Sequence, residues 1–394
     1  MAHINQSIIA QPPNPMFRLG VLVHGRSDIV HLEFGEPDFA TPAHIVEAGM
    51  RSLRDERQGY GPGNGMRWLR EAVARRVTRV DGFSPDPDHV VVSMGGTGGL
   101  MASLLCLTAP GDDVLVPDPA WAGYDAMLAE ANVRAVRYPL LAERGWQPDL
   151  EALEAAVTPR TTVLLMNSPS NPGGAVFPGE TIERMVEICL RRDLWLLSDE
   201  CYDEIVFEGK HVSPATLDDD GRVVTIGTCS KSYAMTGWRV GWVVAPPVVA
   251  PAVGLAVTAQ VNNLPLFAQR AAEAALTGPQ QRVGEMVAAY RARRDVATEI
   301  LRERGLLEYT PAGAFYLLAH VAGEAEPFEG VAFAEALIRE RGIAVAPGVA
   351  FGPATARYAR VSLASGEDAI RAGLTGLLDF AASYDPSPQG WRLP

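Results

Sequence analysis

The sequence contains very little lysine. Of its 34 lysine and arginine residues, only Lys210 and Lys231 are lysines. Arginine stays protonated, whereas a lysine amine can lose its proton when it is desolvated and can then attack a carbonyl carbon. A lysine kept against this bias is a candidate for chemistry that arginine cannot perform. Lys210 lies in Glu-Gly-Lys-His, which is typical of an exposed loop, so Lys231 is the stronger candidate.

Patterns that bind metals or direct export are also lacking. The four cysteines form no Cys-x-x-Cys pair, and the seven histidines form no His-x-x-x-His pattern. We therefore expect no metal site and a reducing, cytoplasmic compartment. The N-terminus lacks a basic segment followed by an apolar one, which indicates no signal peptide. No run of about 18 apolar residues is present, so no membrane-spanning helix is expected.

The length and charge of the chain narrow the class of protein further. A chain of 394 residues favours two domains, and 47% hydrophobic with 21% charged residues is ordinary for a globular enzyme. The net charge of −13 argues against a nucleic-acid-binding surface. We therefore expect an acidic, globular enzyme.

Apolar strands alternate with helical segments from residue 89 to residue 245. The predicted strands cover residues 89–93, 113–117, 161–166, 194–198, 223–226 and 240–244. This alternation predicts an α/β fold with a mainly parallel sheet and helices on both faces. A long helix over 267–304 and a smaller α+β unit are expected to follow.

Residues suited to ligand binding follow the predicted strands. Gly95, Gly96 and Thr97 come after the first strand, in a glycine turn that could offer backbone N–H groups to a phosphate. The residues after the later strands are Trp121, Asn171, Asp199 and the loop that contains Lys231. In parallel sheets ligands bind at these carboxyl ends, so we expect one site there. Two plain alternatives are a core role for Trp121 and a helix N-cap role for Asp199.

Five segments carry a family resemblance. They are the Ser-Lys-Ser-Tyr-Ala-Met-Thr-Gly-Trp-Arg segment from Ser230 to Arg239, Gly-Glu-Pro-Asp-Phe from Gly35, Asn-Ser-Pro-Ser-Asn-Pro up to Pro172, Ser-Asp-Glu-Cys-Tyr up to Tyr202, and Ala-Arg-Val-Ser-Leu-Ala from Ala359. Together they resemble the class I/II aminotransferases of the aspartate aminotransferase superfamily. That family has the fold type I of pyridoxal 5′-phosphate (PLP) enzymes, and the resemblance extends from Gly35 to Ala364.

The resemblance implies a role in cofactor binding for several residues. Lys231 would carry PLP as a Schiff base, the internal aldimine, and Asp199 would keep the ring nitrogen protonated. Trp121 would stack on the ring, while Asn171 and Tyr202 would bond its hydroxyl. The phosphate would be bound by the residues that surround the glycine turn, namely Gly95, Gly96, Thr97, Thr228, Ser230 and Arg239.

The resemblance also implies a substrate site and a dimer. Arg360 would bind the substrate α-carboxylate, with Gly35 and Asn171 beside it. Tyr60 would reach the cofactor phosphate of a neighbouring subunit, so a homodimer with shared active sites is implied. The implied domains are an N-terminal arm with part of the small domain over 1–44, a large PLP-binding domain over 45–275 and a small domain over 276–394.

The implied reaction is transfer of an amino group from an α-amino acid to a 2-oxo acid. The same cofactor site also supports a β-lyase, a decarboxylase or an oxidase. A transcription regulator built on this fold would need an N-terminal DNA-binding domain, for which the arm leaves no room. A hydrolase using Ser230 and Lys231 is disfavoured, because adjacent residues of an extended segment point to opposite faces.

The side chain of the substrate is inferred from the cations that the sequence lacks. Thr97 stands where some relatives that act on acidic substrates carry a lysine, and no second arginine is identifiable as a carboxylate clamp. A buried carboxylate without a cation is costly. The sequence therefore favours neutral or aromatic amino donors, with 2-oxoglutarate or pyruvate as the acceptor.

Overall fold

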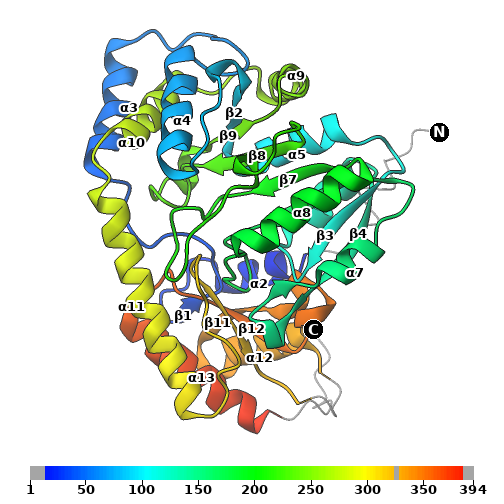
Figure 1. Cartoon of the computed structure of the whole chain (residues 1–394). Coiled ribbons are helices and arrows are strands. Elements are labelled where there is room, and N and C mark those ends of the chain that lie inside the picture. Colours follow the sequence, from blue (N-terminus) through cyan, green and yellow to red (C-terminus); the bar gives the residue numbers. More distant parts are fainter. Residues whose placement is uncertain (1–13, 324–327, 385–394) are drawn as a thin grey trace, which may run out of the picture.

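The computed structural model describes residues 14–323 and 328–384, and the first thirteen residues of the expected arm lie outside this part. Its largest element is an eight-stranded sheet with the order β2-β9-β8-β7-β6-β3-β4-β5 (Figure 1). The strands are β2 (Val90–Met94), β3 (Asp113–Asp118), β4 (Arg134–Leu141), β5 (Gln147–Pro148), β6 (Thr161–Asn167), β7 (Trp195–Asp199), β8 (Val223–Thr228) and β9 (Val240–Val244).

The sheet is mainly parallel, which confirms the predicted fold class. Strands β4, β3, β6, β7 and β8 pair in parallel, whereas β9 is antiparallel to both of its neighbours and β5 is antiparallel to β4. Alternate residues pack on opposite faces: Val114 and Val116 belong to one hydrophobic cluster and Leu115 to another. Strands buried on both faces must be apolar throughout, which explains the continuous apolar runs of the sequence.

Helices cover both faces of this sheet. One face packs on α5 (Gly95–Leu107), α6 (Gly123–Glu130) and α9 (Ala250–Val261). The other packs on α7 (Leu150–Ala155) and α8 (Gly179–Arg192) at one end, and on α3 (Ala43–Asp55), α4 (Arg67–Val80) and α10 (Leu266–Thr277) at the other. The carboxyl ends of the parallel strands are the place where ligands bind in sheets of this kind.

A second sheet of four strands lies in the lower part of the molecule (Figure 1). Its order is β1 (Val30–Leu32), β11 (Ile343–Pro347), β12 (Tyr358–Ser362) and β10 (Tyr316–His320). Helices α2 (Pro15–Val23), α11 (Gln281–Glu303), α12 (Gly330–Arg341) and α13 (Glu367–Ser383) contribute to its packing. Because β1 pairs with β11, the segment near residue 30 shares a sheet with the C-terminal part of the chain.

The prediction of a single long helix over 267–304 is wrong. The segment forms two helices, α10 and α11, which are interrupted at Gly278 and Pro279. Proline lacks an N–H group and disfavours helical backbone in the residue before it, so α10 ends at Thr277. The break lets α11 run from the level of the larger sheet down to the smaller one (Figure 1).

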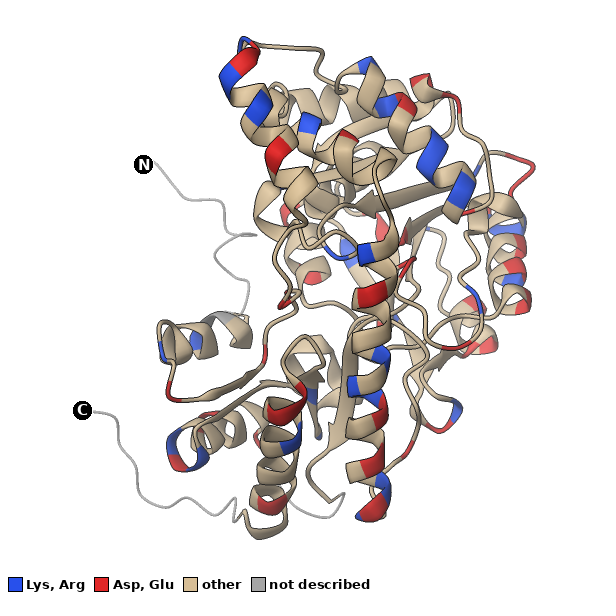
Figure 2. Cartoon of the chain, turned by 90° about the vertical axis from the view of Figure 1, so that its left-hand side faces the viewer, with Lys and Arg blue, Asp and Glu red and all other residues tan. Residues whose placement is uncertain are grey.

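Charged residues of both signs are mixed along the surface helices, including α11 (Figure 2). Arg282 and Glu285 on that helix form an ion pair of 2.8 Å. None of the helices in the described ranges combines the length and apolar character needed to cross a membrane.

Candidate active site

Lys231 lies just beyond β8, in the loop that returns through β9. Its Nζ donates a hydrogen bond of 2.6 Å to the carbonyl oxygen of Gly35. The same Nζ lies 5.8 Å from the ring centres of Tyr202 and Phe315. Within the described chain this amine forms no ion pair with a carboxylate. Lys210 is exposed, as its loop sequence predicted.

Gly35 is required by Tyr316, a residue for which the sequence predicted no role in the site. A Cβ atom at Gly35 would lie 2.2 Å from the hydroxyl oxygen of Tyr316 on β10. That hydroxyl also lies 2.8 Å from the hydroxyl of Tyr202, which follows β7. The contact therefore joins the two sheets next to Lys231. It gives a structural reason for the glycine that differs from the substrate contact expected from the sequence.

Asp199 ends β7 and is 5% exposed. The hydroxyl of Tyr124 donates a hydrogen bond of 2.6 Å to its Oδ2, and the N–H of Cys201 donates one of 3.2 Å to its Oδ1. Burial raises the pKa of Asp199, and the hydrogen bonds from Cys201 and Tyr124 oppose that rise. No helix begins in residues 200–204, so the N-cap alternative for Asp199 is wrong.

Arg360 is a buried cation on β12 and is 4% exposed. It donates hydrogen bonds of 3.1 Å to Oδ1 of Asn171 and 2.5 Å to the carbonyl oxygen of Glu33. Its guanidinium lies 4.4 Å from the ring centre of Tyr316. Its Nε atom has no hydrogen-bond partner among the described residues, and burial lowers the pKa of the guanidinium. Such a buried cation is costly unless an anion joins it.

The glycine segment forms the first turn of α5 instead of a separate turn before Leu100. Met94 at the N-cap provides no side-chain hydrogen bond, so the first N–H groups of the helix have no cap. Gly95 has a φ of 69°, and a Cβ atom there would lie 2.7 Å from Nη2 of Arg239. The glycine thus lets a guanidinium approach an uncapped helix N-terminus. A cation beside free N–H groups suits a phosphate.

Two hydroxyl groups accompany this anion site. Oγ1 of Thr228 donates a hydrogen bond of 2.9 Å to Oγ of Ser230, and both side chains are buried. Thr97, the third predicted hydroxyl residue, is exposed on the first turn of α5. The structure therefore brings the phosphate candidates to the ends of β2 and β8, as their positions in the sequence predicted.

Trp121 and Tyr60 differ in their surroundings. Trp121 is half-buried and meets Tyr124 edge to face, with ring centres 5.3 Å apart. Tyr60 is 89% exposed, and the structure does not bring it to the other predicted residues of its own chain. Its role, if it has the one implied by the resemblance, needs a second subunit.

A hollow of about 600 Å³ opens beside Arg239. Apolar and aromatic side chains line much of it, among them Phe39, Trp238, Leu264 and Phe267. Glu36 also lines it and accepts a hydrogen bond from the hydroxyl of Thr236. With Arg239 also in the lining, the wall carries one charge of each sign.

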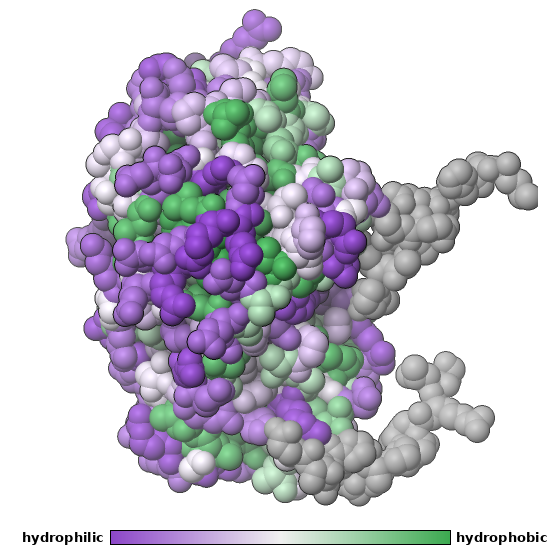
Figure 3. Space-filling model, turned by 45° about the vertical axis from the view of Figure 1, so that its right-hand side comes forward, coloured by the Kyte–Doolittle hydropathy of each residue, from purple (hydrophilic) through white to green (hydrophobic). Residues whose placement is uncertain are grey.

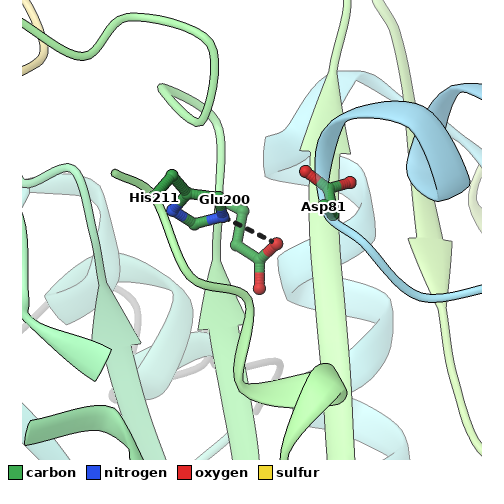
Figure 4. A group of neighbouring side chains, drawn as sticks. All are labelled: Asp81, Glu200 and His211. Atoms are coloured by element: carbon green, nitrogen blue, oxygen red, sulfur yellow. Dashed lines mark hydrogen bonds and ion pairs between the residues drawn. The ribbon is translucent and has the colours of Figure 1, made fainter. Parts of the chain in front are cut away.

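A buried cluster of charged residues includes Glu200, the neighbour of Asp199 in the sequence. The sequence did not predict this cluster, because its members are far apart along the chain. The candidate ligand atoms of Asp81, Glu200 and His211 all lie within 4.8 Å of one another (Figure 4). Nε2 of His211 lies 3.3 Å from Oε2 of Glu200, and Arg76 forms an ion pair of 2.9 Å with Asp81. Arg76 also pairs with Asp203 at 2.6 Å. A guanidinium already supplies cationic charge to this cluster.

Comparisons with known proteins place the chain in a family. The model for "Aminotransferase class I and II" matches residues 27–372. The arginine–pyruvate transaminase of Pseudomonas aeruginosa is 38% identical over 357 residues, which are 90% of this chain and 90% of that protein. The aspartate/prephenate aminotransferase of Thermus thermophilus is 37% identical over 350 residues, or 88% of this chain and 89% of that protein.

Solved structures agree with this assignment. The aspartate aminotransferase from Thermus thermophilus with maleate has a TM-score of 0.89 and 35% identity, and covers 96% of this chain and 100% of that one. The aromatic aminotransferase from Pyrococcus horikoshii OT3 has a TM-score of 0.86 and 31% identity over 93% of this chain and 98% of that one. With a family model over most of its length and relatives above 30% identity, the chain belongs to the class I and II aminotransferases and is a fold type I aminotransferase.

Proposed function

We propose that this aminotransferase uses PLP bound covalently to Nζ of Lys231. One observation carries the proposal: a lysine amine that pairs with no carboxylate of the described residues lies just beyond the end of β8. Strand β8 is the neighbour of β7, which ends at Asp199. The anion site at the N-terminus of α5, with Arg239 against Gly95, fits the phosphate group of that cofactor. The buried carboxylate of Asp199 fits a protonated ring nitrogen.

Each side chain then has a definite task in the reaction. When bound, PLP supplies a carbonyl group that joins the substrate amine and a protonated ring that accepts electrons. Arg360, beside Asn171, binds the substrate α-carboxylate, which supplies the negative charge that the buried guanidinium lacks. Nζ of Lys231, once the substrate amine has displaced it from the cofactor, would act as the general base for the proton on the substrate α-carbon. Asp199 holds the proton on the ring nitrogen, and Tyr202 bonds the ring hydroxyl.

The substrate class that we propose is an α-amino acid with a neutral or aromatic side chain, with 2-oxoglutarate or pyruvate as acceptor. Arg360 supports the α-carboxylate part of this proposal, because a simple amine would leave its charge unpaired. Thr97 is a neutral residue where a lysine would favour an acidic side chain, and this supports a preference against acidic side chains. Relatives named for arginine, aspartate and aromatic amino acids show how widely the side chain varies in the family.

Single half-reactions test both the reaction and the substrate. The purified enzyme is mixed with one amino acid at a time, and conversion of the cofactor to pyridoxamine phosphate is followed by absorbance. We expect conversion with neutral or aromatic amino acids and little with aspartate. Fastest conversion with aspartate would show that a second arginine, besides Arg360, clamps the side-chain carboxylate. Release of ammonia and a keto acid without pyridoxamine phosphate would support a lyase or oxidase instead.

We propose further that the enzyme is a homodimer with shared sites. Tyr60, Leu105 and Leu255 are exposed apolar residues on neighbouring elements, since α5 packs on α9 and Gly63 of the Tyr60 loop lies beside Thr258 of α9. Hydrophobic groups are visible among hydrophilic ones on the surface in Figure 3. Exposed apolar residues that lie close together favour a protein interface.

We also propose a cytoplasmic location, which the four free cysteines support.

A further inference from the structure

Tyr124 is a buried residue that none of the motifs above assigned to the reaction. It lies in the first turn of α6, is 1% exposed, and its hydroxyl donates a hydrogen bond of 2.6 Å to Oδ2 of Asp199. The second contact of that carboxylate, from the N–H of Cys201 to Oδ1, is longer at 3.2 Å. The tyrosine therefore makes the shorter of these two hydrogen bonds to the carboxylate.

We propose that Tyr124 is a positioning residue for transamination, whose hydroxyl keeps the Asp199 carboxylate ionised and directed at the ring nitrogen of the cofactor. This rests on the proposed function, because Asp199 has that task only if PLP binds. The hydroxyl touches neither the substrate nor the reacting atoms, and acts through Asp199.

The need for such a donor follows from burial. An isolated carboxyl at this depth tends to become neutral, and a neutral acid holds the proton on a ring nitrogen poorly. Burial raises the pKa of Asp199, and the hydrogen bonds from Cys201 and Tyr124 favour its charged form. Both donors together thus oppose neutralisation of the carboxyl group.

A tyrosine suits this task better than a cationic side chain would. Burial, followed by the charge of Asp199, raises the pKa of Tyr124 well above its usual value, so its hydroxyl remains a donor at every working pH. An arginine or lysine in its place would compete with the protonated ring nitrogen for the same carboxylate. The neutral hydroxyl stabilises the charge of Asp199 and leaves that charge available to the ring.

The location of Tyr124 adds a geometric link. Its ring meets Trp121 at 90° with centres 5.3 Å apart, and both residues belong to one short segment that enters α6. Trp121 is the ring proposed to stack on the cofactor. One segment therefore sets both the stacking ring and the hydroxyl that orients Asp199.

The test compares Tyr124→Phe with Tyr138→Phe, which removes another buried hydroxyl, one that donates 3.0 Å to the carbonyl oxygen of Leu165. Each apoenzyme is titrated with PLP to measure the dissociation constant, and ¹⁵N-labelled PLP reports protonation of the ring nitrogen by its chemical shift. We expect Tyr124→Phe to bind PLP about 10- to 100-fold more weakly, as for loss of a hydrogen bond to a charged group. Its ¹⁵N signal should move towards that of neutral pyridine, whereas Tyr138→Phe should match the wild type.

Asp199→Asn and the double variant Asp199→Asn/Tyr124→Phe complete the experiment. If Tyr124 acts through the carboxylate, the two should bind PLP equally, and this comparison holds even if Tyr124→Phe alone fails to fold with an unpaired buried charge. An unchanged dissociation constant and ¹⁵N shift in Tyr124→Phe, or an added loss in the double variant, would overturn the inference. A wild-type apoenzyme that does not bind PLP would instead overturn the proposed function.

Discussion

Two buried charges of the site differ in how well the protein satisfies them. Asp199 accepts hydrogen bonds from Tyr124 and Cys201, so its charge is stabilised before any ligand arrives. Arg360 has polar contacts with Asn171 and Glu33 but no ion pair with a described carboxylate, and its Nε is unpartnered. A protein tolerates an unsatisfied buried charge where a bound ligand supplies the missing hydrogen bonds and the opposite charge.

Replacing Asp199 tests the electron-accepting role of the ring. Asp199→Ala should fold and retain some cofactor, but kcat should fall about 10²- to 10³-fold, since a barrier rise of about 3–4 kcal/mol is expected when transition-state charge loses its partner. Single-turnover kinetics with a good amino donor measure the effect. Near-normal turnover would mean that Asp199 does not serve the ring nitrogen.

Replacing Arg360 tests carboxylate recognition. Arg360→Lys keeps the charge but loses the planar pair of donors, so kcat/KM for amino acids should fall about 100-fold. The matched control is Arg371→Lys, an exposed arginine paired with Glu367 at 2.9 Å, which should leave kcat/KM unchanged. Equal kcat/KM in Arg360→Lys and the wild type would remove Arg360 from the substrate site.

At the scale of elements, the site depends on loops that are held by contacts between the two sheets. The Gly35 segment reaches Lys231 through a carbonyl oxygen and is held against Tyr316 of β10. Thr41 reinforces this by donating a hydrogen bond of 2.6 Å to the carbonyl oxygen of Ala234. The position of the lysine amine is thus set partly by a segment almost 200 residues away.

Gly35→Ala tests this arrangement. Its Cβ would lie 2.2 Å from the Tyr316 hydroxyl, so the loop must shift away from Lys231. We expect a loss of about 1–3 kcal/mol in stability, measured by thermal unfolding, together with weaker PLP binding. Gly284→Ala in α11 is the control, because a Cβ atom added there would meet no other atom within 4 Å and alanine favours a helix. If both variants behave alike, Gly35 has no special packing role.

The sequence predicted those elements whose pattern is local. The apolar runs at 113–117 and 194–198 lie within strands β3 and β7 or next to their ends, because a strand buried on both faces needs apolar residues throughout. The prediction of one helix over 267–304 was wrong. Helical periodicity continues on both sides of Gly278 and Pro279, so the pattern alone does not reveal the break between α10 and α11. The order of residues along the chain also placed the phosphate candidates correctly at the strand ends.

Partners distant in sequence could not be predicted. Tyr124 lies three residues after Trp121, in a segment already singled out by its sequence, so a signal was present, but its bond to Asp199 spans 75 positions. The contact of Tyr316 with Gly35 and the cluster of Asp81, Glu200 and His211 have no local signature. Such contacts depend on how the sheets and loops pack.

On the scale of the whole molecule, the proposed dimer predicts complementation between inactive subunits. A Lys231→Ala subunit mixed with a Tyr60→Phe subunit should form heterodimers with one intact site, so activity should exceed that of either parent. The control mixes Lys231→Ala with Asp199→Ala, which damages both sites of the heterodimer and should restore nothing. If the Lys231→Ala and Tyr60→Phe mixture matches its parents, Tyr60 does not serve a neighbouring subunit.

The buried charge cluster predicts a pH dependence of stability. Burial alone would lower the pKa of His211, but the hydrogen bond and charge of Glu200, with Asp203 and Asp81, outweigh burial and raise it. A raised pKa means that the folded state binds the proton more tightly, so its stabilisation is complete below about pH 6.5 and is lost as the pH rises further. Urea unfolding of the wild type should therefore show stability falling above about pH 6.5, with a flatter profile for His211→Gln. Parallel profiles would contradict the assignment.

The central claim is that Lys231 carries the cofactor, and chemical trapping tests it most directly. The enzyme loaded with PLP is reduced with borohydride, digested, and its peptides are mapped by mass spectrometry. The two lysines of the chain make the outcome unambiguous, because Lys210 is an internal control exposed on a loop. The account predicts a phosphopyridoxyl adduct on Lys231 alone; an adduct on Lys210, or no adduct, would contradict it.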